Sequence, residues 1–355
     1  MIIRHNFRFC LLFGIALGLF VLGACSRGED TDVVSEGAQS PASIETDSLV
    51  VYTYDAFPRA LRDALTTHFA EEFGVTVDLQ RLADTGALFN QLYLERENPR
   101  ADVVIGLDAT YLSRVYELGL TVPYRPDAAN EINADLIVDD QFRVVPFDYG
   151  GITLNYDSAA LPDPPGSWDE LTDERFRSSI VMLNPATSSP GRNFLLLTVA
   201  VFGDDGFEQF WRQLRPNVLT VTGGWTDGYG LYVQGEAPMV VSYDTSPAYH
   251  IEYEDTDRYR PLIFDDEVYL QIEVAGVVNR ARNELNARRA IEFILSREFQ
   301  ELIPLNQFMF PVRDDVELPT AFTAYPRAAS PVVLPPDVVA ENFEDWLARW
   351  EAIMR

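Results

Sequence analysis

The sequence predicts an α/β protein with two lobes, and three observations support this fold class. The chain has 355 residues, too many for one small core and enough for two domains of ordinary size. Short β-branched and aromatic runs alternate with segments of helical periodicity, an order typical of a parallel, doubly wound sheet. The segment 146–151 begins a second module, and the strand-like stretch 270–278 leads out of it. We therefore expect two connections between the lobes.

The elements of the first lobe follow one another from residue 49. The expected order is strand 49–54, helix 61–73, strand 75–79, helix 84–97 and strand 101–107. In parallel sheets, ligands bind beyond the carboxyl ends of the strands. Four polar residues stand at such ends and are candidates by topology alone: Tyr54, Asp55, Asp84 and Asp108.

The second module repeats this pattern. Its expected elements are strand 181–183, helix 191–202 and strands 218–222, 239–243 and 270–278. A helix at 284–295 and an apolar stripe along 338–354 follow, and we expect the tryptophans of that stripe to pack in a core. The expected division of the chain is 48–147, completed by 275–355, for lobe 1 and 148–274 for lobe 2.

Composition excludes several classes of protein. The chain has 27 Lys+Arg against 55 Asp+Glu, and its formal charge of −28 repels nucleic acid and anionic lipid. No lysine occurs, which excludes Schiff-base enzymes, Walker-type phosphate loops and Ser-x-x-Lys nucleophiles. With only three histidines, a multi-histidine metal site is not expected. The hydrophobic share of 47% fits a folded protein that works in water.

Residues 1–24 have the pattern of an export signal. Arg4 and Arg8 precede an apolar run of signal-peptide length, shorter than a comfortable membrane span. The run ends in Leu-Gly-Ala-Cys, which resembles the lipobox of bacterial lipoproteins, so Cys25 is the expected lipidation site. Residues 25–47 are acidic and lack aromatic residues, which predicts a disordered tether. We expect an extracytoplasmic protein that contacts a membrane only through this lipid anchor.

Three polar segments carry aromatic residues that a core would not require. They are 223–230, 243–250 and 306–311, and we expect each to be a loop that exposes flat rings. Any single ring could instead cover a local turn, but the three together favour an aromatic-walled pocket. With carboxylates nearby and few cations, such a pocket suits a flat or cationic ligand held by stacking and cation–π contact.

Other polar residues admit two interpretations. The segment 187–191 precedes a helix, so it forms either an anion cradle or a plain N-cap at Ser188 or Ser189. Asp84 either contacts a ligand or only caps the helix that follows it. His250 is isolated, and we expect it to serve as a structural hydrogen-bonding residue.

Several motifs occur together, in a consistent order, between about Leu49 and Trp350. They include VYTYD at 51–55, ADVVIGLD at 101–108, PFDYG at 146–150, TSSPG at 187–191 and TSPAYH at 245–250. This ordered set resembles the thiamine-binding proteins of bacterial ABC importers. The resemblance implies a periplasmic-binding-protein fold of type II, in which two α/β lobes close over thiamine or its phosphate without catalysis, cofactor or metal. It also implies a monomer that delivers its ligand to an ABC permease.

Carried over by position, the resemblance implies that seven residues line the ligand cleft: Tyr54, Asp84, Ser188, Trp225, Tyr243, Tyr249 and Phe308. Phe308 stands where the family pattern has a tryptophan, so one wall would stack less strongly. A ferric-ion or polyamine receptor of the same fold is an alternative, although an iron site usually uses adjacent tyrosines and no Tyr-Tyr pair occurs. An extracytoplasmic hydrolase also stays open, because the fold sets the spacing of its two catalytic carboxylates.

Overall fold

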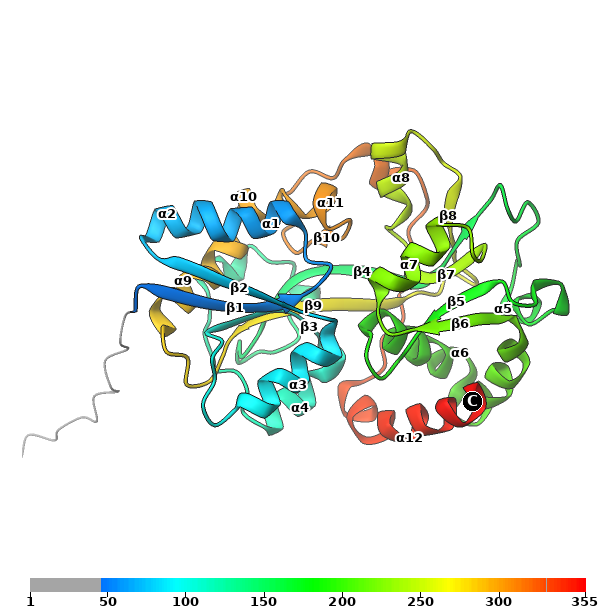
Figure 1. The fold of residues 1–355 in the computed structure, drawn as a ribbon, viewed down its shortest axis with the longest axis horizontal. Helices are drawn as coiled ribbons and strands as arrows, with labels where there is room; N and C mark the ends of the chain where they lie inside the picture. The colour runs from blue at the N-terminus through cyan, green and yellow to red at the C-terminus, as the bar shows by residue number, and fades with distance from the viewer. Residues whose placement is uncertain (1–45, 330) are drawn as a thin grey trace, which may run out of the picture. The chain divides into compact units, whose positions relative to one another are not determined.

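Figure 1 shows the computed structural model of the chain, which describes residues 46–329 and 331–355. The expected signal peptide at 1–24, the lipidation site Cys25 and nearly all of the tether at 25–47 lie outside the described residues. Within the described ranges, no helix has the length and apolar character needed to cross a membrane.

The first core has the strand and helix alternation that the sequence predicts. Its early elements are β1 (Ser48–Tyr54), α1 (Arg59–Asp63), a π-helical turn (Ala64–Phe69), α2 (Ala70–Phe73), β2 (Thr76–Leu82), α3 (Thr85–Glu95), β3 (Val103–Asp108) and α4 (Leu112–Glu117). β1 pairs in parallel with both β2 and β3. The carboxyl ends of the three strands, including Tyr54 and Asp108, therefore meet at one edge of the sheet.

The second core repeats this order. Its elements are α5 (Trp168–Leu171), β5 (Ile180–Leu183), α6 (Ser189–Leu214), β6 (Val218–Thr222), α7 (Trp225–Val233), β7 (Met239–Tyr243), α8 (Pro247–Glu254) and β8 (Tyr259–Leu262). β5 pairs in parallel with both β6 and β7. α6 runs beyond the predicted helix and bends at Gly203, whose φ of +74° is left-handed and suits glycine.

Two long strands link the cores, as the sequence predicts. β4 (Val145–Asp157) carries the chain from the first core to the second, and β9 (Tyr269–Val277) carries it back (Figure 1). They pair antiparallel and complete one sheet in the order β2-β1-β3-β9-β4-β7-β5-β6, with β8 and β10 (Phe310–Pro311) added at β4. The expected all-parallel sheet is therefore wrong at its centre, because strands that lead out and back run in opposite directions.

The segment 223–230, expected to be a flexible loop, is mostly the helix α7. Its glycines permit close packing. A Cβ added at Gly228 would lie 2.3 Å from the Cδ2 atom of Leu183, so any larger residue there would force the Leu183 side chain or α7 to move. The segment 243–250 also departs from the expected loop, because the helix α8 begins at Pro247.

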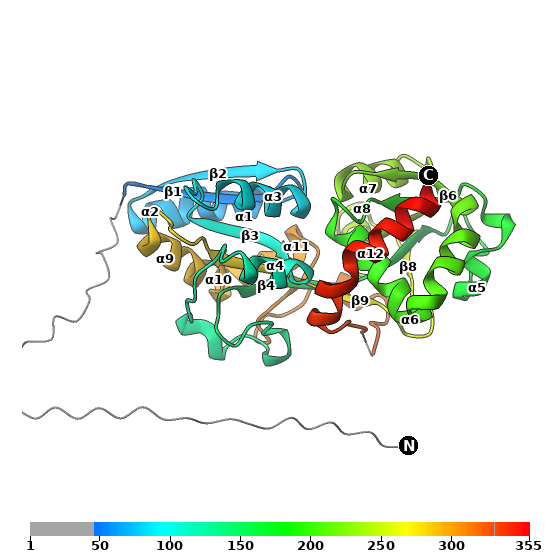
Figure 2. The same cartoon turned by 90° about the horizontal axis from the view of Figure 1, so that it is seen from below.

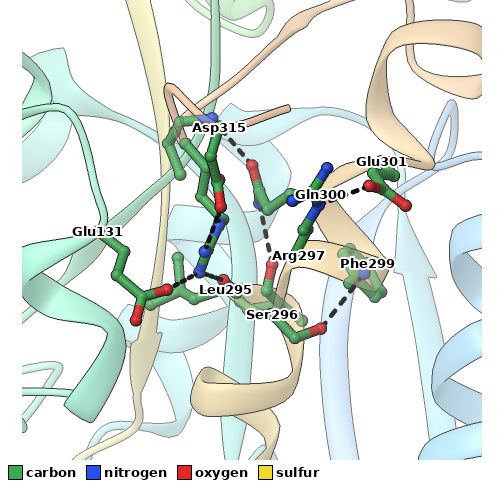
Figure 3. A network of polar contacts seen from close by, with 11 residues as sticks. Glu131, Leu295, Ser296, Arg297, Phe299, Gln300, Glu301 and Asp315 are labelled. Carbon is green, nitrogen blue, oxygen red and sulfur yellow. Dashed lines mark hydrogen bonds and ion pairs between the residues drawn. The ribbon is translucent and has the colours of Figure 1, made fainter. Parts of the chain in front are cut away.

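After β9 the chain returns to the first core in three helices: α9 (Glu284–Ile294), α10 (Arg297–Gln300) and α11 (Ile303–Asn306). Figure 3 shows a network of hydrogen bonds and ion pairs that holds the chain after α11 against α10. Gln300 accepts a hydrogen bond from the backbone amide of Val312 at 2.8 Å, and Arg313 pairs with Asp315 at 2.9 Å. These contacts fix the far end of the loop at 307–309, which reaches the site described below.

The last helix, α12 (Pro336–Met354), contacts both lobes. Its buried residues belong to the second core: Val339, Phe343, Trp346 and Trp350. The tryptophans therefore pack as expected, but they pack on the second core, whereas the sequence assigned 275–355 to lobe 1. Arg114 of α4 pairs with Glu344 of α12 at 3.6 Å, and Figure 2 shows α12 beginning next to α4 and running across the second group of elements. Helical periodicity predicts a buried face without saying which core receives it.

Candidate functional site

A cavity of about 480 Å³ is lined by side chains from both lobes. Its lining includes Tyr54, Asp55, Asp84, Thr85, Ser189, Trp225, Tyr229, Tyr243, Ser246, Tyr249, His250, Glu254, Glu273, Gln307 and Phe308. Of the seven residues that the sequence predicts for the ligand cleft, only Ser188 is missing from this lining. It is fully buried, directly before Ser189, which does line the cavity.

Stacked aromatic rings form one wall of the cavity. The Trp225 ring lies on the Tyr229 ring with centroids 4.8 Å apart and an angle of 18° between their planes. The indole Nε1 of Trp225 donates to Ser242 Oγ at 2.9 Å, which holds the ring in this orientation. A flat ligand can stack on a ring fixed in this way.

Tyr249 and Phe308 meet at another part of the cavity. Their rings pack edge to face with centroids 5.3 Å apart, and Tyr249 keeps 41% of its surface exposed. Phe308 has a φ of +56°, a left-handed conformation that a bulky residue rarely adopts. Strain of this kind gathers at binding sites, where the surrounding structure over-determines the backbone.

His250 holds Tyr229, one of the two stacked rings, through a hydrogen bond. It is fully buried, with Nε2 2.9 Å from the hydroxyl of Tyr229 and Nδ1 2.7 Å from Glu254 Oε2. Burial raises the pKa of Tyr229, so its hydroxyl keeps its proton and can donate to Nε2. The structural hydrogen-bonding role that the sequence predicts for His250 is confirmed.

A carboxylate that sequence reasoning missed lies at the base of the cavity. Glu273 of β9 accepts hydrogen bonds from Tyr54 at 2.8 Å, from Gln271 at 3.3 Å and from Tyr243 at 3.5 Å. Gln307 in turn donates to the Tyr54 hydroxyl. Burial raises the pKa of Glu273 to about 8, although the hydrogen bond from Tyr54 opposes the shift. The available signal was one acidic residue in a mostly apolar strand.

The two lobes touch beside the cavity through Asp84. Its Oδ1 caps α3 by accepting from the Thr85 amide at 2.7 Å, and its Oδ2 accepts from the Trp225 amide at 3.4 Å. The backbone amide of Gly86 donates to the Thr187 carbonyl at 3.2 Å, which adds a second link between the lobes. Burial raises the pKa of Asp84 to about 6.

The helix start at 187–191 turns its second serine toward the cavity. Ser188 is the N-cap of α6 but makes no side-chain cap bond, whereas Ser189 Oγ lies 3.3 Å from Gln271 Nε2 and 3.4 Å from Thr85 Oγ1. The anion cradle stays a prediction. Asp108 is buried outside the lining, where it accepts from Asn193 at 2.6 Å.

The charge of the lining is one-sided. Four carboxylates line the cavity, from Asp55, Asp84, Glu254 and Glu273, and no arginine does. Within the described part of the chain, no group of three or more His, Cys, Asp or Glu side chains could hold a metal ion. The cavity therefore offers aromatic faces and carboxylate oxygens, which suit a flat, cationic or hydrogen-bond-donating organic ligand.

The chain is similar to known proteins over most of its length. The family model for bacterial extracellular solute-binding proteins matches residues 98–332. A thiamine-binding periplasmic protein of Brucella abortus is 38% identical over 316 residues, which cover 88% of this chain and 94% of that protein. The thiamine-binding periplasmic protein of Escherichia coli is 35% identical over 311 residues, covering 85% of this chain and 92% of that one.

Solved structures agree with the observed architecture. A periplasmic thiamin binding protein aligns with a TM-score of 0.78 at 34% identity, covering 87% of this chain and 96% of that chain. A ferric binding protein from Campylobacter jejuni aligns with a TM-score of 0.71 at 20% identity, covering 86% of this chain and 99% of that one, a likeness that concerns the fold alone. The two-lobed periplasmic-binding-protein fold of type II that the sequence predicts is confirmed.

Proposed function

Because this chain belongs to the family of bacterial extracellular solute-binding proteins, we propose that it captures thiamine outside the cytoplasmic membrane and delivers it to an ABC permease. Its similarity to thiamine-binding periplasmic proteins over more than four fifths of the chain supports this ligand. The protein acts by binding and release, and we expect thiamine to leave it unchanged.

The observation that carries the proposal is the pairing of a fixed aromatic face with an uncompensated carboxylate in one cavity. Thiamine joins an aminopyrimidine ring to a positively charged thiazolium ring. The Trp225 face offers a stacking surface for either ring, and Glu273 offers acceptor oxygens and negative charge. The cavity volume of about 480 Å³ lies within the roughly 300–1,000 Å³ of small-molecule sites.

Phosphorylated thiamine belongs to the same proposal. The hydroxyethyl end of thiamine carries the phosphate in thiamine monophosphate, and the α6 N-terminus beside Ser188 and Ser189 offers a dipole and hydroxyls to an anion. The net charge of −28 opposes a more highly charged tail over a longer range. We therefore expect thiamine and its monophosphate to bind similarly, and the diphosphate to bind no better.

The protein is proposed to work as a monomer tethered by lipid on Cys25. Such an anchor holds the binding body near the permease while it samples the surrounding water. The motif at the end of the apolar N-terminal run supports this part of the proposal.

Ligand identification on the purified full-length protein tests the function. Mass spectrometry of small molecules released on denaturation should detect thiamine or its monophosphate, and calorimetry should give saturable binding of both. Putrescine and ferric citrate, titrated in parallel, should give no binding. Binding of either one without thiamine would favour a polyamine or ferric-ion receptor, and turnover of thiamine during incubation would favour a hydrolase.

A further inference from the structure

A row of acidic residues crosses the strands that link the lobes. Glu273 of β9 pairs with Asp148 of β4 on one side and with Asp108 of β3 on the other. All three are buried, and only Glu273 lines the cavity. Residues that pair across adjacent strands share one face of a sheet, so the charge of each acts on its neighbour.

The surroundings of Glu273 are arranged for a negative charge. Three donors reach its carboxylate from β1, β7 and β9, namely Tyr54, Tyr243 and Gln271. The Tyr54 hydroxyl already accepts from Gln307, so its own proton is directed at Glu273. Hydrogen bonds of this kind favour the ionised form of a carboxyl group.

No arginine lines the cavity beside Glu273. The carboxyl groups of Asp84, Asp108 and Asp148 are among the charged groups that act on Glu273, Tyr54 and Tyr243. The guanidinium that acts on this cluster is that of Arg192, which acts through Asp108 and lies between the rings of Tyr111 and Phe343. An ionised Glu273 therefore has hydrogen-bond donors but no arginine beside it in the cavity lining.

Asp148 shows how the empty site avoids a second buried charge. Its two carboxyl oxygens have no hydrogen-bond partner among the described residues, and the side chain is fully buried. Burial and the charge of Glu273 raise the pKa of Asp148 well above its usual value, which favours its protonated, uncharged form. Burial likewise raises the pKa of Glu273, to about 8, and Glu273 is the member of the pair that lines the cavity.

We propose that Glu273 selects a positively charged ligand, and that the ligand's cation takes the place of a proton held on Glu273 when the cavity is empty. This inference rests on the proposed function, because the thiazolium ring supplies the permanent positive charge. The proton leaves to solvent, and no covalent bond of the ligand changes.

The sign of the pH dependence follows from this exchange. At pH 7, a carboxyl group with a pKa of 8 is about nine-tenths protonated. A bound cation favours the ionised form, so binding releases close to one proton, and affinity rises with pH by up to about tenfold per unit. The rise should extend from pH 6 to pH 8 and flatten above the pKa of the empty site.

Calorimetry of the full-length protein in three buffers tests the exchange. Thiamine is titrated at pH 7 in phosphate, HEPES and Tris, whose different ionisation heats report the number of protons released. We expect a release of 0.5 to 1 proton, as roughly estimated from the pKa of the empty site. A neutral isostere of thiamine, in which carbon replaces the thiazolium nitrogen, should bind more weakly and release no proton.

Two variants locate the exchange on Glu273. Glu273→Gln should bind thiamine about tenfold or more weakly, release no proton and bind the neutral isostere as wild type does. Asp244→Asn is the matched control, because Asp244 is a buried carboxyl group with a pKa raised to about 6 that does not line the cavity. This control should keep the proton release of wild type.

The wild-type measurements test the role of Glu273 and the proposed function separately. Thiamine binding by wild type with buffer-independent heat, or equal affinity for thiamine and the neutral isostere, would overturn the role of Glu273 and leave the proposed function intact. Absence of thiamine binding by wild type in every buffer would overturn the proposed function, and this inference with it. The wild-type measurements suffice for this decision if Glu273→Gln does not fold.

Discussion

Asp84 and Trp225 join the two lobes, because the Asp84 Oδ2 atom accepts a hydrogen bond from the Trp225 backbone amide at 3.4 Å. Asp84 is the N-cap of α3, and Trp225 is the first residue of α7. One carboxylate therefore serves a helix N-terminus in each lobe, where helix dipoles favour negative charge. The N-cap interpretation of Asp84 is confirmed, and its contact with a ligand stays a prediction.

Removing the Asp84 side chain should cost stability through the lost cap. We expect Asp84→Ala to lower the free energy of unfolding by about 0.5–2 kcal/mol, whereas Asp84→Asn, which retains an acceptor, should lose much less. Urea unfolding of both variants at pH 5 measures the difference. Equal stability of the two variants would mean that the bond to Thr85 contributes nothing to α3.

The pH dependence of stability should change when Asp84 is made neutral. Burial raises the pKa of Asp84 to about 6 in the folded protein, against 3.8 for an ordinary aspartate, so the folded state binds its proton more tightly. The stability that this proton confers is complete below about pH 4 and is lost as the pH rises toward 6. Asp84→Asn should therefore gain on wild type across this range by at most roughly 3 kcal/mol. A constant difference between wild type and variant from pH 4 to pH 7 would contradict this expectation.

Some aromatic residues of the lining should contribute to thiamine binding alone, and others should contribute to both binding and the stability of the fold. Tyr249→Ala and Trp225→Ala should each weaken thiamine binding by roughly 0.5–2 kcal/mol, up to about 30-fold. Tyr249→Ala should leave the melting temperature of the empty protein nearly unchanged, because Tyr249 is 41% exposed. Tyr243→Ala should also lower stability, since it opens the buried network around Glu273.

Tyr253→Ala is the control for this series. Tyr253 is 58% exposed, contacts both Tyr249 and Phe308, and does not line the cavity. Its loss should leave calorimetric affinity unchanged. If Tyr253→Ala weakens thiamine binding as much as Tyr249→Ala does, the assignment of the ligand contact to Tyr249 is wrong.

Ser188 should distinguish thiamine from its monophosphate. If the phosphate binds at the α6 N-terminus, Ser188→Ala should weaken the monophosphate more than thiamine by roughly 1.5–3 kcal/mol, as for a hydrogen bond to a charged group. Titrating both ligands into both proteins gives this double difference. A value near zero would restrict Ser188 to the start of its helix and point to its neighbour Ser189, which lines the cavity.

The membrane anchor has its own test in the expected lipidation site. Cys25→Ala should abolish the incorporation of labelled palmitate and release the protein into the soluble extracytoplasmic fraction. Cys10→Ala is the matched control, because Cys10 lies inside the expected signal peptide. Continued labelling of the Cys25 variant would contradict the lipobox interpretation.

Much of the fold follows from local patterns in the sequence. The predictions are wrong where packing between distant residues determines the structure. Apolar runs and helical spacing predict the alternation of strands and helices from β1 to β3, because these patterns extend over only a few residues. The glycines at 223–230 indicate a loop by propensity, yet Gly228 is needed inside a helix because Leu183 leaves no room for a Cβ. No local pattern reports that kind of constraint.

The same limit of local patterns explains why the sequence predicts some residues of the site and misses others. Tyr54 and Asp84 follow from strand ends, a rule of topology, and the aromatic residues follow from their polar surroundings. Glu273 is hidden in the middle of β9, and its importance arises only when β1, β4 and β7 surround it with Tyr54, Asp148 and Tyr243. Such a site depends on contacts between residues far apart in the chain.

Helix α12 contacts the two lobes differently. Trp346 and Trp350 bury their rings in the second core, whereas Arg114 and Glu344 form an exposed ion pair worth about 0–1 kcal/mol. When the lobes part, the helix should stay with the second and let go of the first. Separation of the lobes would then expose little apolar surface of α12, because its buried side chains stay in the second core.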